Sequence, residues 1–72
     1  MKPFVCLSVE DSGGNRCVDI LNDSGVFGFV ECRRDPEDPS GWRHIGPVKT
    51  GFETAKSAIH AARSSVGWMV AV

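Results

Sequence analysis

The sequence predicts an α+β fold in which an antiparallel sheet of three to four strands, arranged as a meander, packs on one C-terminal helix. Short β-prone stretches separated by turn-forming residues fill the N-terminal part of the chain. The C-terminal part instead carries apolar residues at helical spacing. With 72 residues, the chain is expected to form a single domain, residues 1–72, with a small core.

Three stretches rich in β-branched and apolar residues are the first predicted strands. Clusters of Asp, Ser, Gly and Asn separate them and are typical of hairpin turns. The predicted strands cover residues 3–10, 16–21 and 26–34.

A shorter fourth strand is predicted at residues 42–46. The preceding loop, residues 35–41, contains two prolines and three acids, which cannot sustain a strand ladder. Pro47 then ends the strand or places it at an edge.

The helix is predicted over residues 53–66. Thr54 or its neighbour is the preferred N-cap, although Thr50 with Glu53 also matches a capping box. Gly67 is the expected left-handed C-cap, with Trp68 folding back on the helix. The apolar tail, residues 69–72, is expected either to dock on the domain or to pair as a short strand. The apolar helix face consists of Ala55, Ala58, Ile59, Ala62 and Val66.

One helix covers only one face of a sheet. The alanine-rich helix allows close approach, so we expect it to cover the strand face with small or branched residues. These are Val5, Leu7, Val9, Val18, Ile20, Val26, Gly28, Val30, Cys32 and Ile45. The opposite face would then carry Phe4, Cys6, Leu21, Phe27, Phe29, Glu31, Arg33, Trp42 and His44.

Phe27 and Phe29 flank Gly28 and, two residues apart in a strand, point to the same side. An exposed apolar patch on that side indicates a binding surface. The leading hypothesis is a non-enzymatic binding domain that contacts protein, including a second copy of itself. Strand addition at a sheet edge is a second route. Phenylalanine in a strand usually belongs to a core, so burial of both rings is the competing interpretation. The expected partner-binding residues are Phe27, Phe29, Arg33, Trp42 and His44.

Nucleic-acid binding on the same face is the alternative function. The segment Phe27-Gly28-Phe29-Val30 resembles the RNP1 motif of RNA-recognition motifs, a resemblance that implies base stacking on both rings. In this alternative, Arg33, Arg34 and Arg43 contact phosphates. The net charge of −1 disfavours it, because phosphate contacts dominate nucleic-acid affinity.

Residues 25–63 also resemble the plant AP2-type DNA-binding domain. The matching features are Arg34-Asp35-Pro36, Trp42, and the stretch Phe52-Glu53-Thr54-Ala55-Lys56-Ser57-Ala58. The resemblance implies three strands packed on one helix. That family reads DNA with arginines and tryptophans of its first strands, and residues 3–21 contain no tryptophan. The DNA-reading residues therefore do not carry over.

The sequence predicts no enzymatic activity, no cofactor and no metal. It shows no set of nucleophile, base and orienting group. The three cysteines, Cys6, Cys17 and Cys32, are interpreted as reduced, small apolar residues. A metal site with His44 or His60 as a fourth ligand is disfavoured, because no Cys-x-x-Cys spacing is present. No apolar run is long enough to span a membrane, and a cytoplasmic location is expected.

Overall fold

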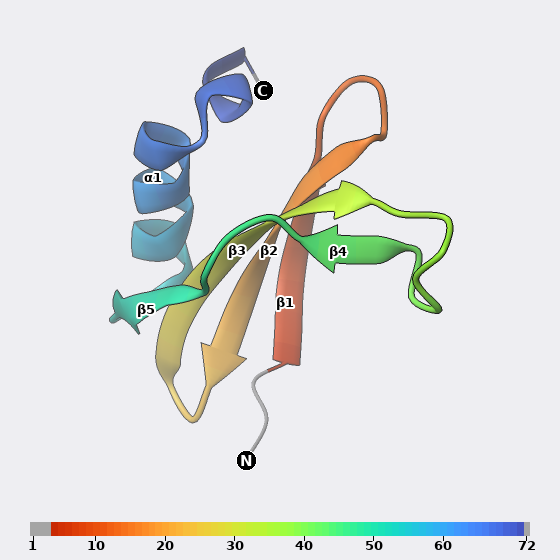
Figure 1. The fold of residues 1–72 in the computed structure, drawn as a ribbon. Helices are drawn as coiled ribbons and strands as arrows, with labels where there is room; N and C mark the ends of the chain where they lie inside the picture. The colour runs from red at the N-terminus through yellow and green to blue at the C-terminus, as the bar shows by residue number, and fades with distance from the viewer. Residues whose placement is uncertain (1–3, 72) are drawn as a thin grey trace.

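A computed structural model describes the backbone of residues 4–71 and the side chains of residues 4–69. Within this range five antiparallel strands are followed by one α-helix and a short 3-10 helix (Figure 1). The predicted α+β class and C-terminal helix are therefore confirmed. The elements are β1 (Phe4–Glu10), β2 (Arg16–Asp23), β3 (Val26–Arg34), β4 (Trp42–His44), β5 (Lys49–Phe52), α1 (Ala55–Ser65) and η1 (Gly67–Ala71).

The strands lie in the order β1-β2-β3-β4, and β5 also pairs with β3. Two short strands thus share one edge of β3. β4 pairs with the end of β3 at residues 32–34, and β5 pairs with its beginning at residues 27–29. The sequence did not predict β5. It has only four residues, and one of them, Gly51, adopts a left-handed φ of 102°, which is atypical of a strand.

The register between β2 and β3 corrects the predicted faces of the sheet. Ser24 and Gly25 both have positive φ and form a two-residue hairpin loop that sets Asp23 opposite Val26. Phe29 consequently pairs with Ile20, and directly paired side chains share a face. The expectation that Phe27 and Phe29 lie opposite the helix was wrong.

A second correction concerns β1. Its register with β2 shifts between Val5 and Leu7, so Leu7 lies opposite Ile20 while Val5 lies opposite Leu21. This irregularity at Cys6 has the effect of a β-bulge, which places Val5 and Leu7 on opposite faces. Leu7 therefore lies on the helix side as predicted, and Val5 does not.

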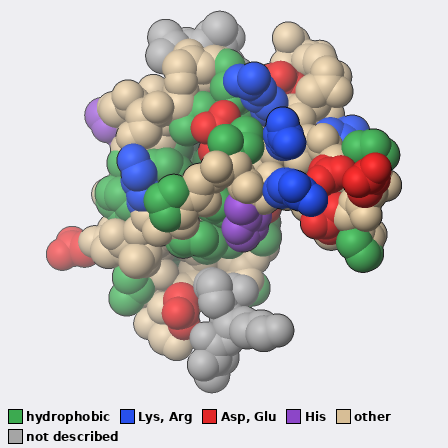
Figure 2. Space-filling view, in the orientation of Figure 1, with side chains coloured by type: hydrophobic (Ala, Val, Ile, Leu, Met, Phe, Trp, Pro, Cys, Tyr) green, Lys and Arg blue, Asp and Glu red, His purple; other side chains and the backbone are tan. Residues whose placement is uncertain are grey.

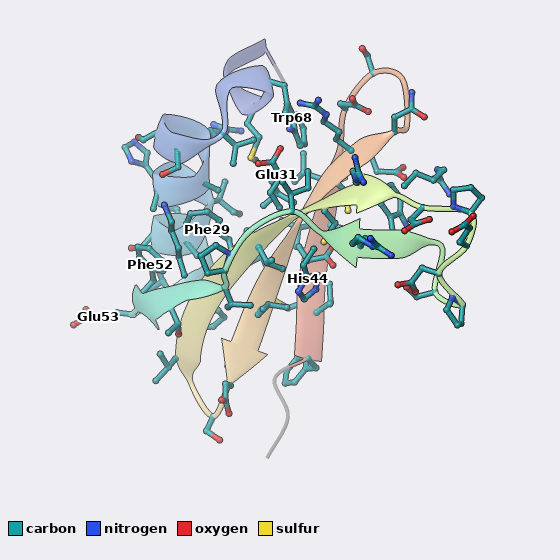
Figure 3. All side chains as sticks on the ribbon, in the orientation of Figure 1. Phe29, Glu31, His44, Phe52, Glu53 and Trp68 are labelled. Carbon is teal, nitrogen blue, oxygen red and sulfur yellow. The ribbon has the colours of Figure 1, made fainter. Side chains whose placement is uncertain are left out.

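The core beneath α1 is made by both large and small side chains. Ala58 and Ala62 are fully buried, and their small size lets the helix approach the sheet. The rings of Phe29 and Phe52 lie 5.9 Å apart between α1 and the sheet (Figure 3). The buried members of this cluster are Val18, Ile20, Phe29, Ala58, Ala62, Val66 and Met69.

The tail docks on the domain as the short helix η1, because Met69 is buried in this core. The neighbouring Trp68 donates its Nε1–H to Glu31 Oε2 at 3.0 Å (Figure 3). This bond ties η1 to β3. The terminal Val72 lies outside the described residues.

The helix begins as predicted and ends differently. Thr54 is the N-cap and accepts a hydrogen bond from the Ser57 backbone N–H at 3.0 Å. The helix ends at Ser65, and Val66 is extended while its N–H still donates to the Ala62 carbonyl. Gly67 is therefore not the predicted left-handed C-cap. It opens η1, which bends the chain so that Met69 reaches the core.

Candidate functional site

The face of the sheet turned away from α1, here called the open face, holds a second apolar cluster. Cys17, Leu21, Val30 and Cys32 are buried there, and Trp42 packs against them. The sheet is strongly twisted (Figure 1). Side chains of β1 and of β4 line the same hollow. Cysteine side chains, not phenylalanine rings, therefore occupy the centre of the open face.

A row of chemically active side chains crosses this face from strand to strand. Glu10 of β1 pairs with Cys17 of β2, which pairs with Cys32 of β3, which pairs with His44 of β4. Side chains paired in this way share a face, with Cβ atoms about 5 Å apart. A carboxylate, two thiols and an imidazole thus lie in sequence across four strands.

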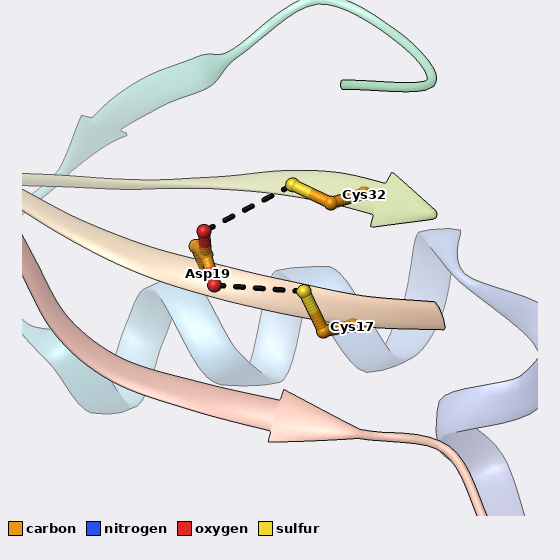
Figure 4. A group of neighbouring side chains, drawn as sticks. All are labelled: Cys17, Asp19 and Cys32. Atoms are coloured by element: carbon orange, nitrogen blue, oxygen red, sulfur yellow. Dashed lines mark hydrogen bonds between the residues drawn. The ribbon is translucent and has the colours of Figure 1, made fainter. Parts of the chain in front are cut away.

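Asp19 lies two residues from Cys17 on the same side of β2 and joins the two thiols. Its Oδ1 atom is 3.7 Å from the Cys17 Sγ atom, and its Oδ2 atom is 3.9 Å from the Cys32 Sγ atom (Figure 4). The hydroxyl of Ser8 donates to Oδ1 and helps to orient the carboxylate. One ligand atom from each of Cys17, Asp19 and Cys32 lies within 4.8 Å of the others.

Burial keeps both thiols protonated. The exposed fraction is 3% for Cys17 and 1% for Cys32. Burial, followed by the nearby Asp19 carboxylate, raises the pKa of Cys17 to about 12. The same two causes raise the pKa of the Cys32 thiol. At neutral pH each S–H group therefore donates toward the carboxylate.

A hollow of about 220 Å³ leads from solvent to this group of side chains. Its walls come from β1, β2 and β4, with Trp42 on one side. Because Cys17 and Asp19 both line the hollow, a small ion can reach them. The lining residues are Val5, Ser8, Glu10, Cys17, Asp19 and Trp42.

The five residues predicted to bind a partner do not share one surface. Phe27, Phe29 and Arg33 lie on the helix side of β3, whereas Trp42 and His44 lie on the open face. Phe29 is only 4% exposed beneath α1. The predicted continuous aromatic surface is therefore absent from the part of the chain that the structure describes.

The three arginines proposed for phosphate contact are also divided. Arg33 pairs with Arg43 on one face, and Arg34 lies on the other. The Arg43 Nε atom is 2.9 Å from Asp35, and the Arg34 guanidinium lies 4.3 Å from the Trp42 ring centroid and 3.6 Å from Glu10. Figure 2 shows the basic side chains near β4 beside the acidic side chains of the loop that precedes it. These acids offset much of the basic field.

The most exposed apolar segment is β1. Among the described strands it pairs with β2 alone, and α1 packs on β2, β3 and β5 instead. Phe4, Val5 and Leu7 are 59%, 51% and 44% exposed. The strand therefore presents apolar side chains beside a row of backbone groups that face away from β2.

Comparison of the chain with protein-family models, with curated proteins and with solved structures finds no match. Among residues 4–71, no helix is both long and apolar enough to cross a membrane.

Proposed function

We propose that this chain is a non-enzymatic, cytoplasmic binding domain that associates with a second copy of itself through β1. The observation that carries the proposal is the exposure of apolar side chains along a seven-residue edge strand. Sheet edges of this kind pair readily with another strand, since their backbone N–H and C=O groups have no partner across the edge.

The sequence of β1 suits pairing with its own copy. In a symmetric antiparallel pair whose backbone register is centred on Leu7, Leu7 lies opposite Leu7, while the shift at Cys6 sets the side chains of Val5 and Val9 on different faces of the sheet. The one charged residue of the strand, Glu10, then faces Phe4 instead of another Glu10. The two Glu10 carboxylates are thereby kept apart, so they do not repel each other. This arrangement favours pairing of β1 with a second copy of itself over pairing with a strand of arbitrary sequence.

Natural edge strands are usually protected by lysine, proline or a bulge. Within β1 the register shift at Cys6 is one such device, but the strand from Phe4 to Glu10 contains no lysine and no proline. In the proposed pair the regular part of one copy, residues 7–10, lies opposite residues 4–7 of the other copy, which include the shift at Cys6.

Light scattering coupled to size-exclusion chromatography tests the proposal over micromolar to millimolar concentration. We expect a dimer mass for the wild-type chain and a monomer mass for Leu7→Lys, which places two ammonium groups opposite each other at the dimer axis. Ile45→Lys is the matched control, because Ile45 is 48% exposed and lies outside β1. This variant should remain dimeric.

Two results would refute the proposal: a wild-type monomer at every concentration, or a dimer that survives Leu7→Lys. Titration of a labelled mixed-sequence oligonucleotide at low salt decides the alternative. Binding that weakens steeply with added salt and with Arg33→Ala would instead favour nucleic-acid recognition.

A further inference from the structure

We propose that Cys17, Asp19 and Cys32 form a binding site for a divalent metal ion that prefers thiolate ligands, such as Zn²⁺, and that His44 supplies the fourth ligand. The four ligands belong to β2, β3 and β4, so the proposal does not depend on self-association, although Ser8 of β1 contacts Asp19.

The donor set carries the first argument. Two thiolates select zinc over magnesium or calcium, which prefer oxygen ligands. A carboxylate and an imidazole complete the tetrahedral coordination that zinc adopts in structural sites. The register places His44 of β4 beside Cys32 on the same face, so its imidazole can turn toward the group that Cys17, Asp19 and Cys32 form.

The distances carry the second argument. A tetrahedral zinc ion with usual bond lengths separates a sulfur ligand from an oxygen ligand by about 3.5 Å. Asp19 Oδ1 lies 3.7 Å from Cys17 Sγ and Oδ2 lies 3.9 Å from Cys32 Sγ, and one ligand atom from each of the three residues lies within 4.8 Å of the other two. Small side-chain rotations therefore suffice to enclose an ion, and the backbone register need not change.

Charge balance carries the third argument. In the metal-free site, one Asp19 carboxylate accepts from two neutral thiols, and the group has a charge of −1. When M²⁺ binds, each thiol releases its proton and two metal–sulfur bonds form, so the charge of the group remains −1. Metal binding thus leaves the net charge of the buried site unchanged. An added charge would be costly there, because a buried charge loses its hydration.

The competing chemistry is a disulfide between Cys17 and Cys32, since the two residues are paired directly. Disulfide formation needs a thiolate and an oxidant. Zn²⁺ binding needs no oxidant, because each thiol proton leaves to the buffer as a metal–sulfur bond forms.

The first experiment titrates Zn²⁺ into the reduced full-length chain after treatment with a chelator. Calorimetry in buffers of different ionisation enthalpy should give one ion bound per chain and two protons released, one from each thiol. Co²⁺ in place of Zn²⁺ should produce thiolate-to-cobalt charge-transfer absorption and the intense visible bands of a tetrahedral site. The spectrum reports sulfur ligation in the unmodified chain, so it does not depend on the folding of any variant.

Variants then assign the ligands. Cys17→Ser, Cys32→Ser and Asp19→Asn should each raise the Kd for Zn²⁺ by more than about 100-fold, beyond the effect usual for a residue that only orients a ligand. Ser8→Ala should raise it by roughly 10-fold. Cys6→Ala is the matched control, because Cys6 is an exposed free thiol outside the group. Its affinity should equal that of the wild-type chain.

The proposal is overturned if the reduced chain binds no Zn²⁺, if the Co²⁺ complex lacks sulfur charge-transfer absorption, or if Cys6→Ala abolishes binding. Isolation of a chain two hydrogens lighter, with Cys17 joined to Cys32 and no metal affinity on reduction, would overturn it in favour of the disulfide. An unchanged Kd in His44→Ala would overturn the assignment of the fourth ligand.

Discussion

Gly28 lies where β5 crosses closest to β3, and replacing it with alanine should weaken this contact. The two strands pair at this point, with Gly28 opposite Thr50. A Cβ atom added at Gly28 would lie 2.5 Å from the Lys49 carbonyl oxygen and 3.1 Å from the Thr50 Cα atom. The obstructing atoms belong to the backbone, so they cannot move away by a simple change of rotamer.

The size of the effect follows from this overlap. To restore an ordinary contact, β5 must retreat by most of an ångström, which strains its pairing with β3. Overpacking of this kind costs about 1–3 kcal/mol. For a domain of this size the corresponding fall in Tm is roughly 4–24 °C. Because β5 leads directly into the N-cap of α1, the loss should be shared by the helix.

Urea and thermal unfolding followed by circular dichroism measure this loss. Gly46→Ala is the control, since a Cβ atom there meets nothing within 4 Å and its φ is not in the left-handed region. A Gly28→Ala chain as stable as the Gly46→Ala chain would show that β5 does not approach β3 at this position. The inferred crossing would then be wrong.

Two further predictions concern the tail and the thiols. Trp68→Phe keeps an aromatic ring but removes the N–H group that donates to Glu31. The free energy of unfolding, measured by urea titration, should therefore fall by about 1–2 kcal/mol. An unchanged value would show that this hydrogen bond does not hold η1. The pKa of the Cys17 thiol rises from 9.0 in the unfolded chain to about 12 in the folded chain. Above pH 9 the unfolded chain ionises this thiol and the folded chain does not. The free energy of unfolding should therefore be unaffected by this thiol below pH 9 and fall as the pH rises toward 12. Between pH 10 and 11, unfolding in metal-free buffer should show a loss of stability steeper for the wild-type chain than for Cys17→Ala by a little less than about 1.4 kcal/mol per pH unit; parallel curves would contradict it.

Local signals predicted the elements well. Turn residues separated β2 from β3, although β2 continues to Asp23, two residues past its predicted end. The spacing of alanines together with Thr54 located α1. These features depend on neighbours in the sequence, so they survive in the folded chain. β5 was missed because Lys49–Phe52 is short and contains Gly51, and its pairing with β3 is a long-range contact.

The predicted faces of the sheet were wrong because the prediction grouped residues by the size of their side chains and not by the pairing of their strands. A two-residue hairpin loop pairs even-numbered positions of β2 with odd-numbered positions of β3. The turn at Ser24-Gly25 therefore contained the signal that Phe29 lies beside Ile20. Sorting by size instead grouped Val30 with Val18 and moved the phenylalanines away from the helix.

The grouping of Cys17 with Cys32 had no comparable local signal. Fourteen residues lie between the two cysteines, and neither lies in a Cys-x-x-Cys motif. They meet because the hairpin register sets them opposite each other, and Asp19 joins them because it shares their face. Proximity of this kind is a property of strand pairing.

The amino-acid sequence by itself determined the α+β class, the positions of four of the five described strands and the start of the helix, since propensity, turn chemistry and capping act over a few residues. Tertiary structure alone decided which side chains the helix covers, where β5 crosses at Gly28, and which thiols and carboxylate meet on the open face. The physical reason is the two-residue period of a strand: one step of register exchanges its faces, and only contacts between distant segments select that step.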